Sequence, residues 1–154
     1  MLQLFKQLQG AWKLKRCLGT QGHMQGIAHF QTWGEGVLYY QEQGSATFGS
    51  SQALLAYRAY AYVYDQGTIA VHFWDKERKQ PAGLLHTLNF QSTKTTSQVL
   101  VATGTHKCTD DVYEARYTFV SQKHFQLTYQ VQGPHKDYTI QTCFSREIDG
   151  VSCP

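Results

Sequence analysis

Two short stretches of this 154-residue chain carry side chains able to do chemistry: residues 106–113 (HKCTDDVY) and 133–138 (GPHKDY). In the first, His106 and Cys108 are two positions apart, so on a strand their side chains face the same way. An imidazole can lower the pKa of a neighbouring thiol and carry its proton, as in cysteine nucleophiles. Cys108 is therefore a candidate nucleophile, His106 a candidate general base, and Asp111 a third candidate catalytic residue.

Two other interpretations of these groups stay open. They could form a hydrogen-bonded network that fixes the turn 107–111 and orients Tyr113, since polar groups inside a small β protein must be paired. Imidazole, thiol and carboxylate are also metal ligands, but the four cysteines show no Cys-x-x-Cys spacing. The sequence accordingly predicts no metal site, and it identifies no cofactor.

The second stretch begins as a turn, because Gly-Pro ends one strand and a new strand starts at Lys136. Lys136 and Tyr138 share one face of that new strand. If this face points inward, the two side chains suit an anionic ligand group. The alternative is that Lys136 pairs with a carboxylate of the first stretch at the surface, which stabilises a protein by only ~0–1 kcal/mol.

A third candidate is Arg58, which lies in the middle of a tyrosine-rich segment next to Tyr60. A mid-strand arginine is costly to bury unless it meets a carboxylate or an acidic ligand. Glu42, one hairpin earlier, is the expected internal partner. A bound acid and an internal ion pair therefore both remain possible.

These residues must be held by β-strands, because from Gly10 onward the apolar pattern has a period of two. Glycine and Asp/Gly turn signals break it at short intervals. A short apolar helical face precedes it at residues 2–9, and the charged segment 75–82 is expected to project into solvent. The pattern predicts strands at 10–18, 25–33, 36–47, 53–64, 67–75, 83–92, 97–106, 111–120, 123–132 and 136–147.

The predicted fold is all-β: one antiparallel up-and-down β-barrel of about ten strands with a short N-terminal helix, forming a single domain over 1–154. Closure into a barrel removes the exposed edges that so many short strands would leave. Residues 57–64 alternate large polar-tipped side chains with small apolar ones, as in a barrel wall around a semi-polar lumen. Trp33 and Trp74 are expected in the core or the cavity wall.

Composition narrows the function classes. The net charge is only +3 and the basic residues are scattered, which argues against nucleic acid as a partner. No segment has the length and apolarity of a membrane span or the pattern of a secretory signal. Four free thiols in a cytoplasmic protein are therefore expected. The ten tyrosines suit walls that are apolar on one side and wet at the hydroxyl.

Two family resemblances add to this interpretation. Gly10-Ala11-Trp12 after a short helix, with Arg146 on the last strand, resembles the calycin superfamily of lipocalins and fatty-acid-binding proteins. That resemblance implies a calycin-like barrel in which the arginine packs over the tryptophan at one end. Arg58 and Tyr60 likewise resemble the carboxylate clamp of fatty-acid-binding barrels, in a different position.

The second resemblance covers nearly the whole chain. Five segments resemble the uncharacterised domain-of-unknown-function family DUF6314: 26–30, 38–44, 57–60, 106–113 and 133–138. Where that family has an aspartate-glycine-arginine turn, this chain has Asp75-Lys76-Glu77-Arg78 without the glycine. The family implies a fold but no activity.

The leading hypothesis is a binding module that holds a small, partly apolar, anionic molecule in a tyrosine-rich cavity. Its expected ligand contacts are Arg58, Tyr60, His106, Cys108, Tyr113, Lys136 and Tyr138. Convergence is expected because strands 111–120 and 136–147 start at the same barrel end, about two strand spacings or ~10 Å apart. The rivals are an enzyme using the same cavity and a structural barrel whose lumen is filled by side chains.

Overall fold

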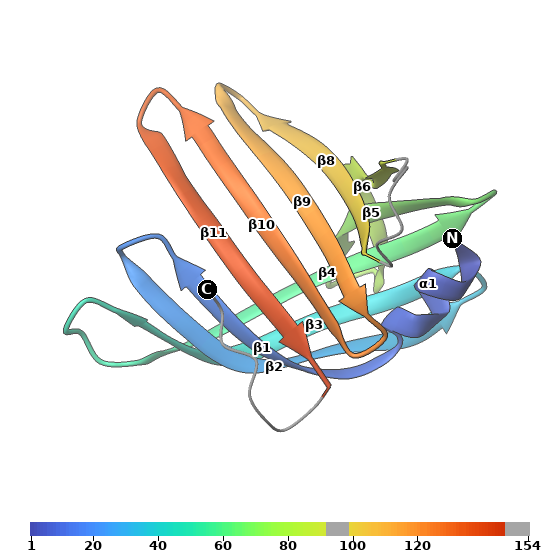
Figure 1. Ribbon diagram of the computed structural model, residues 1–154, viewed down its shortest axis with the longest axis horizontal. Coiled ribbons are helices and arrows are strands. Elements are labelled where there is room, and N and C mark those ends of the chain that lie inside the picture. Colours follow the sequence, from blue (N-terminus) through green and yellow to red (C-terminus); the bar gives the residue numbers. More distant parts are fainter. Residues whose placement is uncertain (92–98, 147–154) are drawn as a thin grey trace.

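The described residues, 1–91 and 99–146 of a computed structural model, form one curved antiparallel sheet preceded by a short helix, α1 (Leu2–Leu8) (Figure 1). The strands are β1 (Gly10–Leu18), β2 (Gly22–Gly34), β3 (Val37–Phe48), β4 (Leu54–Asp65), β5 (Thr68–Asp75), β6 (Gln80–Thr87), β7 (Asn89–Phe90), β8 (Leu100–Cys108), β9 (Asp111–Ser121), β10 (His124–Gly133) and β11 (Lys136–Ser145). The parts of the predicted strands that fall on 92–98 and 147 lie outside the described residues.

The sheet curls into a nearly closed barrel with the strand order β6-β5-β4-β3-β2-β1-β11-β10-β9-β8-β7. Consecutive strands pair with each other except β6 and β7, which form the two edges of the sheet, and β1 pairs with β11, so the first and last strands meet in its middle. Between β6 and β8, the ring nitrogen Nδ1 of His106 donates to the carbonyl of Leu85 at 3.1 Å. The predicted antiparallel barrel is confirmed, with eleven strands in place of about ten.

The charged turn after β5 is shorter than expected. Oδ1 of Asp75 accepts hydrogen bonds from the backbone N–H groups of Glu77 and Arg78 at 3.0 and 2.9 Å. This local bonding stabilises a tight turn, and Lys79 completes it with a φ of 52°. As a result β6 starts at Gln80, three residues before the predicted position.

Strand β4 shows the predicted alternation. Arg58 and Tyr60 line a cavity inside the barrel. Ala61, the residue after Tyr60, points outward, yet it is fully buried because it lies in register between Tyr39 and His72. The outward ring of Tyr39 packs on Trp74 with the centroids 4.5 Å apart.

Trp33 is 47% exposed, and its ring centroid lies 5.1 Å from that of Trp74. The prediction that Trp33 belongs to the core or cavity wall is therefore wrong. Residues 31–33 of β2 face solvent on both sides, so the register that places Phe30 inward leaves Trp33 on the outer face.

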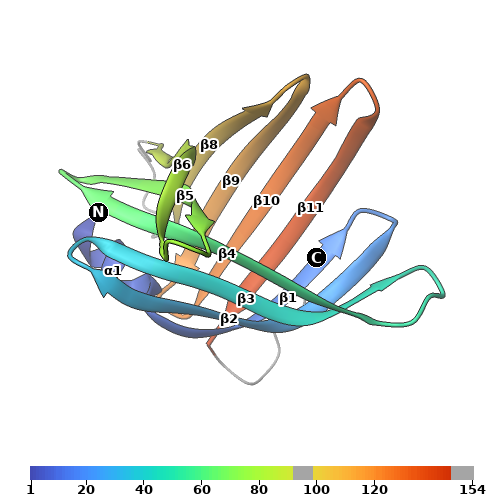
Figure 2. The same ribbon diagram turned by 180° about the vertical axis from the view of Figure 1, so that it is seen from behind.

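Helix α1 lies at one end of the barrel (Figure 2), and Trp12 and Arg146 close that end against it. Indole Nε1 of Trp12 donates to the carbonyl of Leu8 at 2.7 Å. The guanidinium of Arg146 lies 4.3 Å above the Trp12 ring and donates at 2.5 Å to the carbonyls of both Gln7 and Gln9. The predicted packing of Trp12 against Arg146 is confirmed.

The opposite end is open. The turns β1–β2, β3–β4, β8–β9 and β10–β11 all point away from α1 in both views (Figures 1 and 2). Toward the closed end the lumen is filled by rings: Phe125 and Phe144 stack with centroids 4.3 Å apart, and Trp12 meets Phe125 edge-on at 4.9 Å. The polar candidates can therefore gather only in the middle and at the open end.

Cys17 and Cys108 are free thiols, whereas Cys143 is disulfide-bonded. The prediction of four free cysteines is therefore wrong at Cys143, and Cys153 lies outside the described residues. Within 1–91 and 99–146, no helix has the length and apolarity needed to cross a membrane.

Candidate functional site

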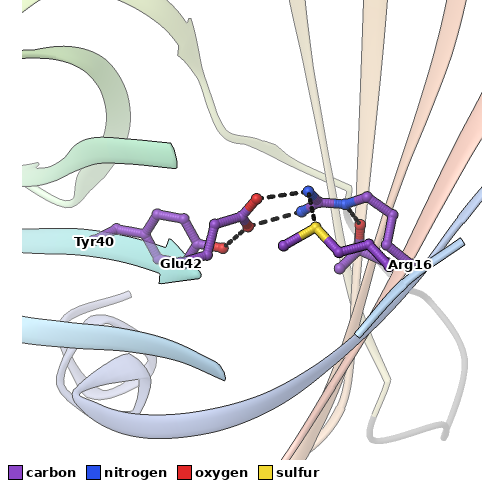
Figure 3. A network of polar contacts seen from close by, with 5 residues as sticks. Arg16, Tyr40 and Glu42 are labelled. Carbon is purple, nitrogen blue, oxygen red and sulfur yellow. Dashed lines mark hydrogen bonds and ion pairs between the residues drawn. The ribbon is translucent and has the colours of Figure 1, made fainter. Parts of the chain in front are cut away.

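The middle of the lumen holds a buried ion pair that joins β1 to β3. Nη1 and Nη2 of Arg16 donate to Oε1 and Oε2 of Glu42 at 2.6 and 2.8 Å, and both side chains are almost fully buried (Figure 3). Arg16 also donates through Nε to Oγ1 of Thr142 at 2.8 Å, while the hydroxyl of Tyr40 donates to Oε2 of Glu42. Such two-point contacts satisfy nearly all the polar atoms of the pair.

The pKa values in this network follow from its contacts. Burial alone would raise the pKa of Glu42, but the hydrogen bonds and charge of Arg16 outweigh it and the net shift is downward. Burial raises the pKa of Tyr40 well above its usual value, so the phenol keeps its proton and remains a donor to Glu42. The carboxylate is therefore fully engaged before any ligand arrives.

Strand β2 lies between β1, which carries Arg16, and β3, which carries Glu42. It leaves space for these two side chains to meet. At the cross-strand pair Gly26–Gly44 a Cβ on either residue would collide with the backbone of the facing strand. These two glycines let β2 and β3 approach closely at this level. No side chain from position 26 stands between Arg16 and Glu42.

Of the two alternatives for Arg58, the ion pair with Glu42 does not form. The two residues are cross-strand partners in register, but the Glu42 carboxylate is taken by Arg16 and Tyr40. Arg58 is exposed at the open end and makes no hydrogen bond or ion pair with any residue in 1–91 or 99–146; only its charge acts on Glu42. Arg16, Glu42 and Arg58 together leave one positive charge in the lumen.

A cavity of about 370 Å³ opens above this layer and is lined by six of the seven residues predicted as ligand contacts. These are Arg58, Tyr60, His106, Cys108, Tyr113 and Tyr138. Four residues that sequence reasoning missed complete the lining: Phe73, Leu85, Tyr129 and Ile140. At this level the lumen is therefore not filled entirely by side chains.

Lys136 lies at the rim of the cavity. Its Nζ contacts Oδ2 of Asp111 at 2.5 Å and donates to the hydroxyl of Tyr113 at 3.0 Å. The hydrogen bond to Asp111 is the first cause of its raised pKa. The neighbouring Gly133 has no room for a Cβ, because Oδ1 of Asp111 occupies that position. The turns β8–β9 and β10–β11 are thus neighbours, as predicted, and Lys136 orients Tyr113.

His106 and Cys108 share the inward face of β8, as their spacing predicts. Because a carbonyl can only accept, the hydrogen bond to Leu85 fixes the proton of His106 on Nδ1. No hydrogen bond joins the imidazole to the Cys108 thiol within the part of the chain that the structure describes. The pair therefore lacks the contact by which a histidine activates a cysteine.

A second buried polar group lies on β6, where that strand faces β8. Nε2 of His86 lies 3.0 Å from the hydroxyl of Tyr117, and its Nδ1 is buried without a partner among the described residues. Burial, and to a smaller extent the charge of His106, lowers the pKa of His86 to about 4. Gly104 gives the ring its space, since a Cβ there would meet it.

The family model described as "Family of unknown function (DUF6314)" matches residues 8–146. No curated protein matches the chain. Among solved structures, the S-type phycobiliprotein lyase CPES from Guillardia theta is similar, with a TM-score of 0.62 and 7% identity over 97% of this chain and 93% of that one. A de novo designed fluorescence-activating β-barrel gives a TM-score of 0.52 and 9% identity over 96% of this chain and 100% of that one. At these identities the likeness shows the fold.

Proposed function

The chain belongs to DUF6314, a family of unknown function, and we propose that it binds a small, partly apolar anion in the 370 Å³ cavity at the open end of the barrel. The cavity is in the size range of small-molecule sites and has mainly aromatic walls with a few convergent polar groups. A designed barrel of similar fold is described as fluorescence-activating, which agrees with a small-molecule site in the lumen.

The observation that carries this proposal is the unpaired guanidinium of Arg58. Its natural partner Glu42 is already bonded to Arg16, so Arg58 offers its donors to the cavity. An acidic group there would gain charge-assisted hydrogen bonds, which are worth ~1.5–3 kcal/mol each. Tyr60, Tyr113 and Tyr138 would then surround the apolar body of the ligand.

The proposal is tested by measuring the affinity for two matched probes with isothermal titration calorimetry. We expect 2-naphthylacetate to bind about tenfold or more tightly than the neutral 2-naphthylacetamide, because only the acid uses the charge of Arg58. Arg58→Met should abolish this difference. Arg116→Met is the control, because Arg116 is exposed on β9 and lies outside the cavity lining. Equal affinity for the acid and the amide in the unmodified protein would refute the anion site.

The rim residues give a second test. His106→Ala removes one lining side chain of the cavity, and Lys136→Ala frees Tyr113, whose hydroxyl accepts a hydrogen bond from the ammonium. Both variants should bind naphthylacetate more weakly while the melting temperature falls by no more than a few degrees, because each variant loses only one or two hydrogen bonds. If either variant instead unfolds the protein, these residues are structural and the binding proposal loses their support.

A further inference from the structure

A second cavity, of about 320 Å³, lies at the open end on the other side of Arg58. Apart from the residues that both cavities share, it is lined from β1, the β1–β2 turn, β2, β3 and the Ala56–Tyr57 part of β4, whereas the first cavity is lined by Tyr60 of β4 and from β5, β6, β8, β9 and β10. Arg58, Tyr138 and Ile140 line both cavities. The two spaces are therefore chambers of one lumen, the first chamber and the second chamber.

The residues shared by the chambers form a partition that spans the barrel. Arg58 comes from β4, while Tyr138 and Ile140 come from β11, which is separated from β4 in the sheet by β3, β2 and β1. Beneath the partition a cavity of only about 20 Å³ reaches the Arg16–Glu42 layer, so there is room for about one water and no ligand arm. A ligand atom held by Arg58 thus has a chamber on each side of it and the Arg16–Glu42 ion pair beneath it.

The walls of the chambers differ in chemistry. The first chamber has five aromatic rings, from Tyr60, Phe73, Tyr113, Tyr129 and Tyr138. The second chamber has three rings, from Phe48, Tyr57 and the shared Tyr138, and its remaining apolar lining is Leu18, Met24, Ala46, Ala56 and Ile140, which are short or flexible side chains. Rings pack well against a flat aromatic group, whereas methionine and aliphatic side chains adapt to a flexible chain.

We infer that the ligand is a two-armed acid: a carboxylate or similar monoanion held at Arg58, with an aromatic arm in the first chamber and a flexible alkyl arm in the second. The inference rests on the proposed function, because Arg58 must bind the acid. It adds that the acidic group lies between the two arms of the molecule. A straight-chain fatty acid has its carboxylate at the end of its chain, so it would fill one chamber only.

Affinity measured along a homologous series tests this inference. The probes are 2-naphthylacetate and its single enantiomers bearing methyl, ethyl, propyl or butyl on the carbon next to the carboxylate. For one enantiomer series we expect the affinity to rise about two- to fourfold with each added carbon, the gain for burying a methylene. Ala56→Phe, which fills the second chamber, should cut the gain in affinity below twofold per carbon. Its affinity for 2-naphthylacetate itself should stay within about threefold of that of the unmodified protein.

Leu55→Phe is the matched control, since Leu55 precedes Ala56 on β4 and is 89% exposed on the outer face. It should keep the full gain. Affinity that does not rise with alkyl length in the unmodified protein overturns the two-armed ligand, as does a gain that Ala56→Phe leaves intact. In both cases binding of 2-naphthylacetate would still uphold the anion site. Failure of 2-naphthylacetate to bind would overturn both proposals.

Discussion

The two ends of the barrel each carry an arginine beside aromatic rings, and they differ in what the guanidinium contacts. At the closed end Arg146 packs on Trp12 and donates to two backbone carbonyls, one in the last turn of α1 and one just after the helix. At the open end Arg58 stands among tyrosines with no hydrogen-bond acceptor in the described residues. A satisfied arginine fixes structure, whereas an unsatisfied one at a cavity is available to a ligand.

Arg16 lies between these extremes and shows what pairing achieves. Its charge is buried, and Glu42, Tyr40 and Thr142 complete the network around it. Because Glu42 satisfies Arg16, it cannot also satisfy Arg58. The unpaired charge at the open end is thus a consequence of the pairing in the middle.

The largest effect is expected when Glu42 is removed. Glu42→Leu leaves the buried Arg16 without its counter-charge, and we expect the free energy of unfolding to fall by about 3–5 kcal/mol. The double variant Arg16→Met with Glu42→Leu should recover most of that loss, because it removes both charges. Urea denaturation measures both variants. A single variant as stable as the unmodified protein would show that Arg16 is not paired in solution.

The second effect is on stability at low pH and comes from the buried His86. The pKa of His86 is lowered to about 4 in the folded state, against about 6.5 in an unfolded chain. Between these values the unfolded state binds a proton that the folded state does not, so stability must fall as pH falls. The slope is at most about 1.4 kcal/mol per pH unit, for a total of about 3 kcal/mol.

Denaturation of the unmodified protein and of His86→Phe between pH 7 and pH 4 isolates this contribution. Phenylalanine does not titrate, so the variant should lose less stability over the same range, whatever its stability at pH 7. Parallel pH profiles for the two proteins would contradict a neutral, buried His86.

A third, smaller effect is expected at the closed end. Arg146→Met removes the cation over the Trp12 ring and two donors to backbone carbonyls, and we expect it to cost about 1 kcal/mol of stability. Binding of 2-naphthylacetate should not change, because Arg146 lies at the end of the barrel opposite the cavity. A loss of binding without a loss of stability would contradict the assignment of a purely structural role to this end.

The same replacement at the open end should have the smallest effect on stability. Arg58→Met breaks no hydrogen bond within 1–91 and 99–146, so the free energy of unfolding should change by no more than about 0.5 kcal/mol. Thermal denaturation of the two variants compares the contributions of the two arginines to stability. A larger destabilisation by Arg58→Met than by Arg146→Met would contradict the assignment of Arg146 as structural and Arg58 as free for a ligand.

Local patterns in the sequence were sufficient to predict most of the fold and much of the site. The period of two assigned Arg58, Tyr60, His106, Cys108 and Tyr138 to one face of their strands, and all five line the cavity. The same parity extends from Trp12 through Leu14 to Arg16, which is buried with them, so Arg16 could have been recognised as a lumen residue. The side-chain period of a strand is a local property, which is why it can be read without the tertiary structure.

Partners across the barrel could not be predicted in this way. The sequence suggests Glu42 for Arg58 because their strands are adjacent, but Glu42 bonds Arg16 across β2, where Gly26 and Gly44 let the strands come close. Likewise, the spacing of His106 and Cys108 puts them on one face without showing that the imidazole bonds Leu85 instead. The sequence by itself determined the strands and their inward faces, and its resemblance to the calycins implied the closing Trp12–Arg146 contact. Only the tertiary structure decided which charges meet and which one is left for a ligand, because that depends on curvature and on distances between strands far apart in the chain.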